Sequence, residues 1–374
     1  MTSYVWIETD CYMIYSNSYN DSKKITFKSD KIASFDLDDT IIKTKSGKTF
    51  SQSADDWMFY DNIEDKLKSL TQNQYTIIII SNQKGIKSGK TKKTDWKGKI
   101  EEMRNRLNID FILMCSLNDD LYRKPRTKLW DEFVKLNIPS IHPDSFYCGD
   151  AGGLKDDFAD TDFKFALNIG IKFIHRDEYI LGNKNLNCIA KYPIDFKKLN
   201  DNNKNNNNKF IEGKDVEVII NVGLPGSGKS TFTKNCILIK GYEYINQDEL
   251  KTQQKCLKKL EEFLKQNKSV VIDNTNVSKV VRKKYLDIIK KYNVKCRCIK
   301  FNTSVEICQH NSYYRNFISE GTVKVIPQLV FNIMKKKMNE PGLDEGFYKI
   351  ETVEFVPMNT MNIKNKEIYE KYYF

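Results

Sequence analysis

The chain of 374 residues lacks any hydrophobic run long enough to cross a membrane. Its longest apolar stretches, residues 75–80 and 216–222, fall far short of the ~18 residues that a membrane-spanning helix needs. The first ten residues carry acidic side chains and no basic segment, so we expect no signal peptide. We therefore expect no membrane association and an intracellular location: the nucleus for a protein of a eukaryotic cell, the host cell or the virion for a viral one.

Histidine is scarce, and no two cysteines have the spacing of a metal site. The nine cysteines are odd in number and include no C-x-x-C pair, and the only histidines are His142, His175 and His310. Neither a disulfide framework nor a zinc site is expected, and a reducing compartment is favoured. Chemistry that depends on a histidine cluster is not expected either.

Negative charge is in the minority, because 61 basic side chains exceed 49 acidic ones and give a formal charge of +12. This charge suggests an anionic partner without naming it. Residues 201–209 consist only of aspartate, asparagine and lysine, so they are predicted to form a linker, with a long loop inside one domain as the alternative. We predict a first domain of residues 1–198 with net charge +2, a linker of residues 199–213, and a second domain of residues 214–374. Residues 199–374 together carry a net charge of +10.

Both halves alternate apolar, strand-like runs with amphipathic helical stretches. This alternation is typical of βαβ units and predicts an α/β fold class, with two domains that each contain a parallel sheet with helices on both faces. In such sheets the functional groups lie at the carboxyl ends of the strands. The predicted strands cover residues 31–36, 75–81, 111–115, 145–150, 172–175, 216–222, 242–246, 269–273 and 295–301, and the predicted helices include residues 96–107, 127–136, 249–265 and 303–319.

A D-x-D-x-T sequence follows the first predicted strand. Residues two apart in an extended segment point to the same side, so Asp36 and Asp38 can converge on one phosphoryl group. One carboxylate can attack phosphorus, and the other can protonate the leaving oxygen and later activate water. Two acids that face an anionic phosphate need a cation, which implies Mg²⁺. The alternative is an acidic turn without function.

Three further groups follow later strands in order: Ser81, Lys124 and Asp150. Singly they could be a turn serine, a solvated lysine and a loop aspartate. In this order they resemble the haloacid-dehalogenase (HAD) phosphatase superfamily, whose members use an aspartyl nucleophile. Asp39 departs from that resemblance, because many members have glycine at this position.

The strand of residues 216–222 leads into a complete G-x-x-x-x-G-K-[ST] motif, which is the strongest signal in the chain. Its glycines let backbone N–H groups turn inward, Lys229 can reach the β and γ phosphates of ATP, and Ser230 can bind Mg²⁺. The predicted nucleotide-binding residues of this segment are Gly223, Gly226, Ser227, Gly228, Lys229, Ser230 and Thr231.

The residues around the phosphoryl acceptor of the second site are less well defined by the sequence. Asp248 either removes a proton from an attacking hydroxyl or caps the helix of residues 249–265. Asp273 ends a strand and can hold the water shell of Mg²⁺. Arg315 either closes over the transferred phosphate or is an ordinary solvated side chain.

Taken together, the two halves resemble the polynucleotide kinase 3′-phosphatases, bifunctional enzymes that heal nucleic-acid strand ends. The resemblance runs from about residue 31 to nearly the end of the chain. In the first half it rests on residues 35–38, 46–50, 56–57, 81–86, 122–125, 149–152 and 162–170. In the second half it rests on residues 223–232, 246–248, 272–276, 296–298, 310–311 and 345–347.

The resemblance implies a role for each matching residue. Asp36 is the phosphorylated nucleophile and Asp38 the general acid–base, with Mg²⁺ held by Asp36, the Asp38 carbonyl and Asp150. Asp248 is the base that activates a 5′-hydroxyl. The phosphate-binding residues that it implies in the first domain are Ser81, Asn82 and Lys124.

The resemblance also has limits. Many family members have arginines near Gln247, Gln309 and Tyr313, so fewer cations surround the second site here. Animal members carry a forkhead-associated domain that binds phosphopeptides, and we expect none here, because only about 30 residues precede the first predicted strand. We expect a monomer that acts on the strand ends of DNA, or of RNA. The alternatives are a kinase–phosphatase for free nucleosides, nucleotides or sugars, and a non-catalytic nucleic-acid-binding scaffold.

Overall fold

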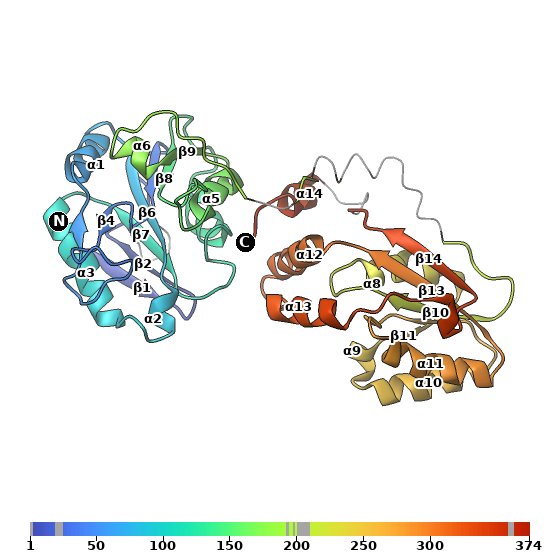
Figure 1. Ribbon diagram of the computed structural model, residues 1–374. Coiled ribbons are helices and arrows are strands. Elements are labelled where there is room, and N and C mark those ends of the chain that lie inside the picture. The colour runs from blue at the N-terminus through green and yellow to red at the C-terminus, as the bar shows by residue number, and fades with distance from the viewer. Residues whose placement is uncertain (1–2, 19–24, 192–193, 197–198, 200–209, 358–362) are drawn as a thin grey trace. The chain divides into compact units, whose positions relative to one another are not determined.

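The computed structural model describes residues 3–18, 25–191, 194–196, 199, 210–357 and 363–374. The chain forms two compact units, one of Met1–Tyr192 together with Lys371–Phe374, and one of Pro193–Glu370 (Figure 1). The predicted linker segment, residues 201–209, lies outside the described residues. No helix in the described part of the chain is long and apolar enough to cross a bilayer. All nine cysteines are free thiols, as their spacing predicts.

The first unit is built on a seven-stranded sheet with the order β1-β2-β7-β6-β3-β8-β9. The strands from β7 to β9 are parallel, but β2 pairs antiparallel with both β1 and β7. The predicted parallel strands are therefore present, and two antiparallel-paired strands that the sequence did not predict extend the sheet at this edge. The turn of three residues between β1 and β2 permits only antiparallel pairing of those two strands. The strands are β1 (Val5–Glu8), β2 (Tyr12–Ser16), β3 (Ile32–Phe35), β6 (Thr76–Asn82), β7 (Ile112–Ser116), β8 (Phe146–Gly149) and β9 (Lys172–His175).

Helices cover both faces of this sheet, as predicted, and each face has its own apolar core. On one face α3 buries Trp96, Ile100 and Met103 along a single side of the helix, as an amphipathic pattern requires. The other face is filled by Trp130 and Phe165, among others. The helices are α1 (Ile63–Gln72), α2 (Lys84–Lys87), α3 (Lys93–Leu107), α4 (Lys128–Trp130) with a π-helical turn (Asp131–Lys135), α5 (Thr161–Ile169) and α6 (Arg176–Tyr179); β4 (Ile42–Lys43) and β5 (Met58–Phe59) form a separate small sheet.

The second unit contains a five-stranded sheet with the order β11-β12-β10-β13-β14, and all of its strands are parallel, as predicted. The sequence did not predict β14, which lies at the edge of the sheet, contains exposed and half-buried residues but no fully buried one, and has no apolar run. The strands are β10 (Glu217–Val222), β11 (Glu243–Ile245), β12 (Val270–Ile272), β13 (Lys295–Asn302) and β14 (Lys349–Glu354).

The helices of the second unit follow the predicted runs with one break. The predicted helix of residues 249–265 is two helices, because Lys251 has a positive φ of 72° and Thr252 caps a new helix by accepting a hydrogen bond from the Lys255 N–H. The helices are α8 (Lys229–Phe232) with a π-helical turn (Thr233–Ile237) and a 3₁₀ turn (Leu238–Lys240), α9 (Gln247–Leu250), α10 (Gln253–Lys265), α11 (Lys279–Lys291), α12 (Val305–Ile318), α13 (Gln328–Lys337), a 3₁₀ turn (Leu343–Glu345) and α14 (Ile363–Tyr369).

The last four residues pack on the first unit, although the second unit precedes them in the chain. Tyr373 is fully buried there. The side chain of Asn168 on α5 donates to the Tyr372 carbonyl (2.7 Å) and accepts from its N–H (2.8 Å), and it also donates to the Pro125 carbonyl (2.8 Å). Lys164 donates to the Phe374 carbonyl (2.8 Å). This C-terminal segment, Lys371–Phe374, therefore braces α5 and the loop beside it.

We expect Tyr373→Ala to destabilise the first unit by about 3 kcal/mol, because truncating a buried aromatic side chain leaves a cavity. Hydrogen exchange in the full chain should show faster exchange along α5 and unchanged exchange along β10 and β13. Tyr373→Phe keeps the ring and is the matched control, so it should behave as the wild type. Unchanged protection of α5 in Tyr373→Ala would contradict this role of the C-terminal segment.

Candidate active sites

The first candidate site begins where β3 ends. The Asp36 N–H donates to the Cys148 carbonyl (2.9 Å), so the parallel ladder extends one residue beyond the strand. The chain then turns, with the Leu37 carbonyl accepting from the Ile41 N–H (2.9 Å). Asp39 occupies this turn at a φ of +56°, a left-handed conformation that suits glycine and that aspartate tolerates better than most residues. The departure from glycine at this position is therefore compatible with the turn.

Lys124 lies at the centre of the first site. Its Nζ is 2.5 Å from Asp36 Oδ1, 2.8 Å from Asp162 Oδ1 and 2.6 Å from the Tyr147 hydroxyl, and its side chain is 3% exposed. Burial alone would lower the pKa of Lys124, but the carboxylates of Asp162 and Asp36 outweigh burial and hold that pKa above its ordinary value. A fixed ammonium therefore lies beside the predicted nucleophile.

Three carboxylates converge next to this lysine. One oxygen of each of Asp36, Asp150 and Asp162 lies within 4.8 Å of the others. Burial, with the negative charges of Asp162 and Asp39, raises the pKa of Asp150 to about 7. Such a crowded group favours a bound cation, and carboxylate oxygens are the ligands that Mg²⁺ prefers. The residues present therefore fit the Mg²⁺ that the sequence implies.

Asp38 lies apart from these three carboxylates and is half-exposed. Its Oδ2 accepts from Gln83 Nε2 (2.6 Å), and the same nitrogen lies 2.8 Å from the Ser81 hydroxyl oxygen. Gln83 therefore connects the predicted acid–base to the predicted phosphate-binding serine. No motif in the sequence predicts a role for Gln83.

The side chain of Asn82 faces the backbone of Lys124 instead of an open space. Its Oδ1 accepts from the Lys124 N–H (3.0 Å), and its Nδ2 donates to the Lys124 carbonyl (3.2 Å). Because both ends of the amide are used in this way, the contacts favour a role in positioning Lys124 over direct phosphate binding.

Asp162 is the main residue of the site for which the sequence predicts no role. It lies in the first turn of α5 and is 2% exposed, and its Oδ2 accepts from the Ala151 N–H (3.2 Å). It thus holds Lys124 and the segment after Asp150 together. The signal in the sequence was an acid in the first turn of an amphipathic helix, and acids are common in first turns without any such role.

The second candidate site is the loop between β10 and α8. Gly226 has a φ of +78°, and a Cβ at this position would lie 2.5 Å from the Cys308 carbonyl oxygen, so both conformation and space require glycine. Gly228 precedes α8 at a φ of +95°. Ser230 and Thr231 are exposed in the first turn of α8. The predicted strand–loop–helix arrangement is present.

Lys229 points back into this loop. Its Nζ donates to the carbonyls of Leu224 (2.7 Å) and Gly223 (3.0 Å) and lies 3.4 Å from the Ser227 hydroxyl. Burial lowers the pKa of Lys229 to about 8, against the opposing effect of Asp273. A buried ammonium that is held by the carbonyls of the loop is well suited to bind an anion.

Asp273 follows β12 and is buried next to the loop. Its two carboxylate oxygens accept from the Asn221 amide (3.2 Å) and the Tyr244 hydroxyl (2.9 Å). Asn221 also donates to the Thr233 hydroxyl (2.7 Å). Neutral donors therefore hold the Asp273 carboxylate in place beside the loop.

Asp248 and Arg315 lie at the rim of the second site, where both are exposed. The helix-cap alternative for Asp248 is wrong, because Asn246 caps α9 by accepting from the Asp248 N–H (2.8 Å). The carboxylate of Asp248 thus remains unused by the cap. The charges of Asp248 and Arg315 both act on the pKa of Lys229, which brings the predicted residues into one electrostatic environment.

One contact of the loop was not predicted. Asn311 on α12 donates to the Gly226 carbonyl (2.8 Å) and accepts from the Tyr369 hydroxyl (2.7 Å). Asn311 occurs in the resembling segment 310–311, but nothing in its spacing shows that it faces the loop.

Known proteins are similar to this chain in both halves. The family described as "Polynucleotide kinase 3 phosphatase" matches residues 31–180, and the "AAA domain" family matches residues 218–341. The "Bifunctional polynucleotide phosphatase/kinase" of Schizosaccharomyces pombe is 38% identical over 94% of this chain and 84% of its own length. A protein of Acanthamoeba polyphaga mimivirus with a name of the same kind is 37% identical over 94% of this chain and 90% of its own length. The "Polynucleotide 3'-phosphatase" of Saccharomyces cerevisiae is 32% identical over 40% of this chain.

Proposed function

Because this chain belongs to the bifunctional polynucleotide phosphatase/kinase family, we propose that it converts 3′-phosphate/5′-hydroxyl strand ends into 3′-hydroxyl/5′-phosphate ends during strand-break repair. The first unit is a 3′-phosphatase and the second an ATP-dependent 5′-hydroxyl kinase. The observation that carries the proposal is similarity along 94% of the chain combined with a full set of acidic, basic and loop residues at both sites.

In the phosphatase unit we assign Asp36 as the nucleophile. Its carboxylate oxygen attacks phosphorus, the bond to the 3′-oxygen breaks, and Asp38 donates a proton to that leaving oxygen. Asp38 then takes a proton from water, which hydrolyses the aspartyl-phosphate and releases phosphate. Lys124 and the Ser81 hydroxyl neutralise and bind the phosphoryl oxygens, and Asp162 and Asn82 keep Lys124 in place.

Asp36 and Asp150, with the Asp38 carbonyl, are the residues that we assign to Mg²⁺ in this unit. The ion supplies positive charge that neutralises the phosphate and the crowded carboxylates. In the kinase unit Ser230 is assigned to the ion that accompanies ATP, with Asp273 holding its water shell.

In the kinase unit Asp248 accepts the proton of the 5′-hydroxyl as its oxygen attacks the γ-phosphate of ATP. Lys229 and Arg315 stabilise the negative charge on the phosphates, and the loop from Gly223 to Gly228 binds them through backbone N–H groups. The exposed position of Asp248 leaves its carboxylate accessible to an entering strand end.

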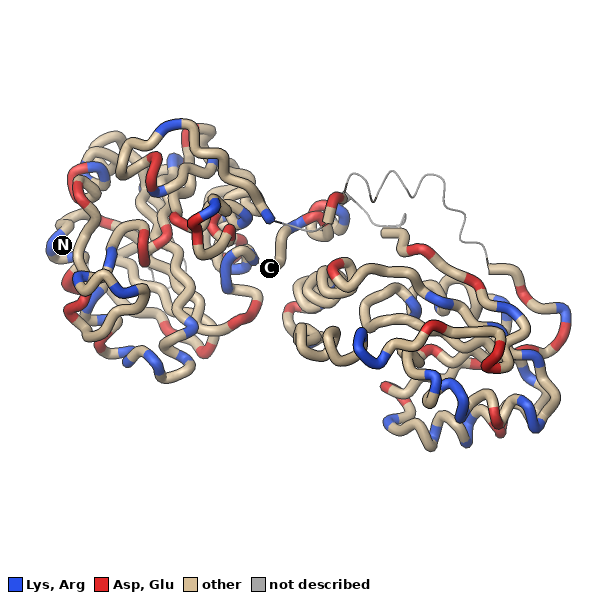
Figure 2. Tube along the Cα trace, in the orientation of Figure 1, with Lys and Arg blue, Asp and Glu red and all other residues tan. Residues whose placement is uncertain are grey.

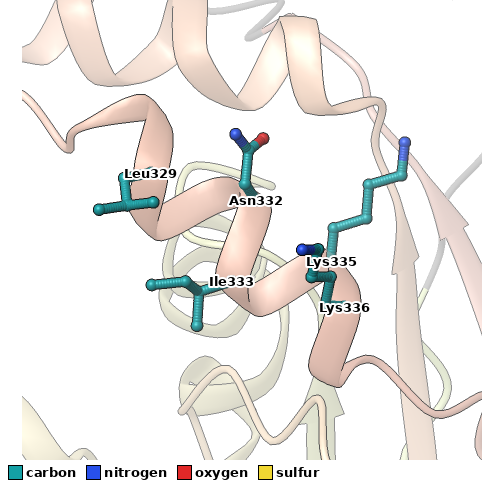
Figure 3. A pocket seen from close by; sticks show the side chains of 5 residues that line it. All are labelled: Leu329, Asn332, Ile333, Lys335 and Lys336. Atoms are coloured by element: carbon teal, nitrogen blue, oxygen red, sulfur yellow. The ribbon is translucent and has the colours of Figure 1, made fainter.

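The uneven charge supports a nucleic-acid partner held mainly by the second unit. Basic residues occur along α10 and α11 (Figure 2). The exposed ones include Lys255, Lys258, Lys283 and Lys284. Lys335 and Lys336 at the end of α13 lie on an exposed side of that helix with Leu329 and Ile333 (Figure 3). Phe331 of the same helix is buried. Lysines at the C-terminal end of a helix are also common on an ordinary solvated face. We therefore assign the binding of the nucleic-acid backbone to the lysines of α10 and α11.

An end-labelled assay with nicked DNA, single-stranded DNA and RNA, each with a 3′-phosphate and a 5′-hydroxyl, tests the proposal. We expect Mg²⁺-dependent loss of the 3′-phosphate and ATP-dependent gain of the 5′-phosphate on at least one of these polymers. Turnover of mononucleotides as fast as of the polymers would favour a kinase–phosphatase for free nucleotides. Metal-dependent turnover of any kind would exclude a non-catalytic scaffold.

A further inference from the structure

Lys99 brings a positive charge to the first site that no sequence motif predicts. Its Nζ lies 3.7 Å from Asp38 Oδ1, and its side chain is only 10% exposed. It lies on α3 directly beside the side that buries Trp96, Ile100 and Met103. The packing of this helix therefore fixes the ammonium next to the half-exposed carboxylate of Asp38.

The hydrogen-bonding capacity of this ammonium is unused. Within the described residues Lys99 donates no hydrogen bond, and at 3.7 Å its contact with Asp38 is an ion pair only. Lys124, by contrast, makes three hydrogen bonds. The other oxygen of Asp38 already accepts from Gln83. A largely buried ammonium with free donors is suited to bind an anion.

The position of Lys99 relative to the reacting groups indicates which anion it binds. Lys124 contacts the nucleophile Asp36, whereas Lys99 contacts Asp38, the group that protonates the leaving oxygen. Lys99 therefore lies on the side of the leaving group. In a 3′-phosphorylated strand that group is the terminal nucleoside, and the next negative charge is the phosphodiester that joins it to the rest of the strand.

We propose that Lys99 binds this phosphodiester and so makes the first site select a strand end over a nucleoside 3′-monophosphate. The inference rests on the proposed phosphatase function and adds the substrate feature that the site recognises. Lys99 is a specificity residue in this scheme, because it touches the substrate one linkage away from the reacting phosphorus.

The test measures kcat/KM for three substrates: a 3′-phosphorylated trinucleotide, the same trinucleotide with an uncharged methylphosphonate at the linkage next to the 3′ end, and a nucleoside 3′-monophosphate. The variants are Lys99→Met, Lys99→Arg and the control Lys97→Met. Lys97 lies on the same helix, and its ammonium is bound to Glu8 (2.8 Å) on β1.

We expect Lys99→Met to lower the preference for the trinucleotide over the nucleoside 3′-monophosphate by about 10- to 100-fold, the range of a charge-assisted contact. The methylphosphonate linkage should lower the kcat/KM of the wild type by the same factor and leave the kcat/KM of Lys99→Met almost unchanged. Lys99→Arg should keep most of the preference, and Lys97→Met all of it.

Equal losses on all three substrates would overturn the proposal, because Lys99 would then act through Asp38. An unchanged preference in Lys99→Met would overturn it as well. Failure of the underlying function looks different, since the wild type would then release phosphate from none of the 3′-phosphorylated substrates.

Discussion

Asp36→Ala is expected to lower 3′-phosphate release by about 10⁴-fold or more while 5′-phosphorylation continues at the wild-type rate. Loss of a covalent nucleophile removes the pathway itself, so the effect is much larger than that of a lost binding contact. The fold should survive, because Lys124 keeps its bonds to Asp162 and Tyr147 when the Asp36 carboxylate is removed. Phosphate release from a 3′-phosphorylated oligonucleotide and transfer from labelled ATP to a 5′-hydroxyl oligonucleotide measure the two activities on one preparation.

Two further variants test whether the loss of phosphatase activity comes from the missing nucleophile. Asp36→Asn keeps the shape of the side chain but not its charge, and it should be nearly as inactive as Asp36→Ala. Asp162→Asn should lose less 3′-phosphatase activity, because it weakens the contacts with Lys124 and with the segment after Asp150 but leaves the nucleophile in place. If Asp36→Ala silenced the kinase as well in a folded protein, the assignment of separate active sites to the two units would be wrong.

The strands that carry the site residues could be predicted because each is an apolar run buried in the sheet. Strands β3, β6, β8 and β10 are buried throughout or nearly so, and their apolar runs were identified to within one or two residues. Strands β1, β2 and β14 were not predicted. β1 and β14 lie at the edges of their sheets and contain no fully buried residue. β2 is largely buried, but its tyrosines and serine give it a weaker apolar run than the four strands above. A half-covered strand has a weak pattern that turns and polar loops also show.

The site residues also differ in how much of their role the local sequence shows. Asp36, Asp38 and Lys229 belong to motifs whose spacing brings them together within a few residues, so sequence alone could nominate them. Lys99, Asp162 and Asn311 come from helices, and each meets its site only through packing with distant parts of the chain. A lysine, an aspartate or an asparagine on an amphipathic helix is most often solvated, so no local pattern separates these three from their neighbours.

The chain end is a case that sequence could not anticipate. Tyr372 and Tyr373 follow the second unit and could only be assigned to it, yet they pack on the first. Two directional hydrogen bonds with Asn168 and one buried ring decide that placement, and neither leaves a periodic signal in four residues.

Lys229→Met is expected to lower 5′-phosphorylation by about 10³-fold or more and to leave 3′-phosphate release unchanged. In phosphoryl transfer the protein contributes mainly positioning and electrostatic stabilisation, so removing the buried ammonium of the loop removes a principal contribution. Methionine keeps the length and the apolar stem of the side chain. It leaves the carbonyls of Gly223 and Leu224 without their lysine donor, which is a local cost. Steady-state kinetics with ATP as the varied substrate separates a loss in kcat from a rise in KM.

Mixing Lys229→Met with Asp36→Ala gives the sharpest control, because each protein keeps the site that the other lacks. On a nick with a 3′-phosphate and a 5′-hydroxyl, the mixture should produce both healed ends, each at about half the rate of the same total concentration of wild type. That outcome requires the two sites to work independently on separately bound ends. If the mixture healed only one end, one variant would have lost more than its own site, and the loss of kinase activity in Lys229→Met could no longer be attributed to the missing ammonium.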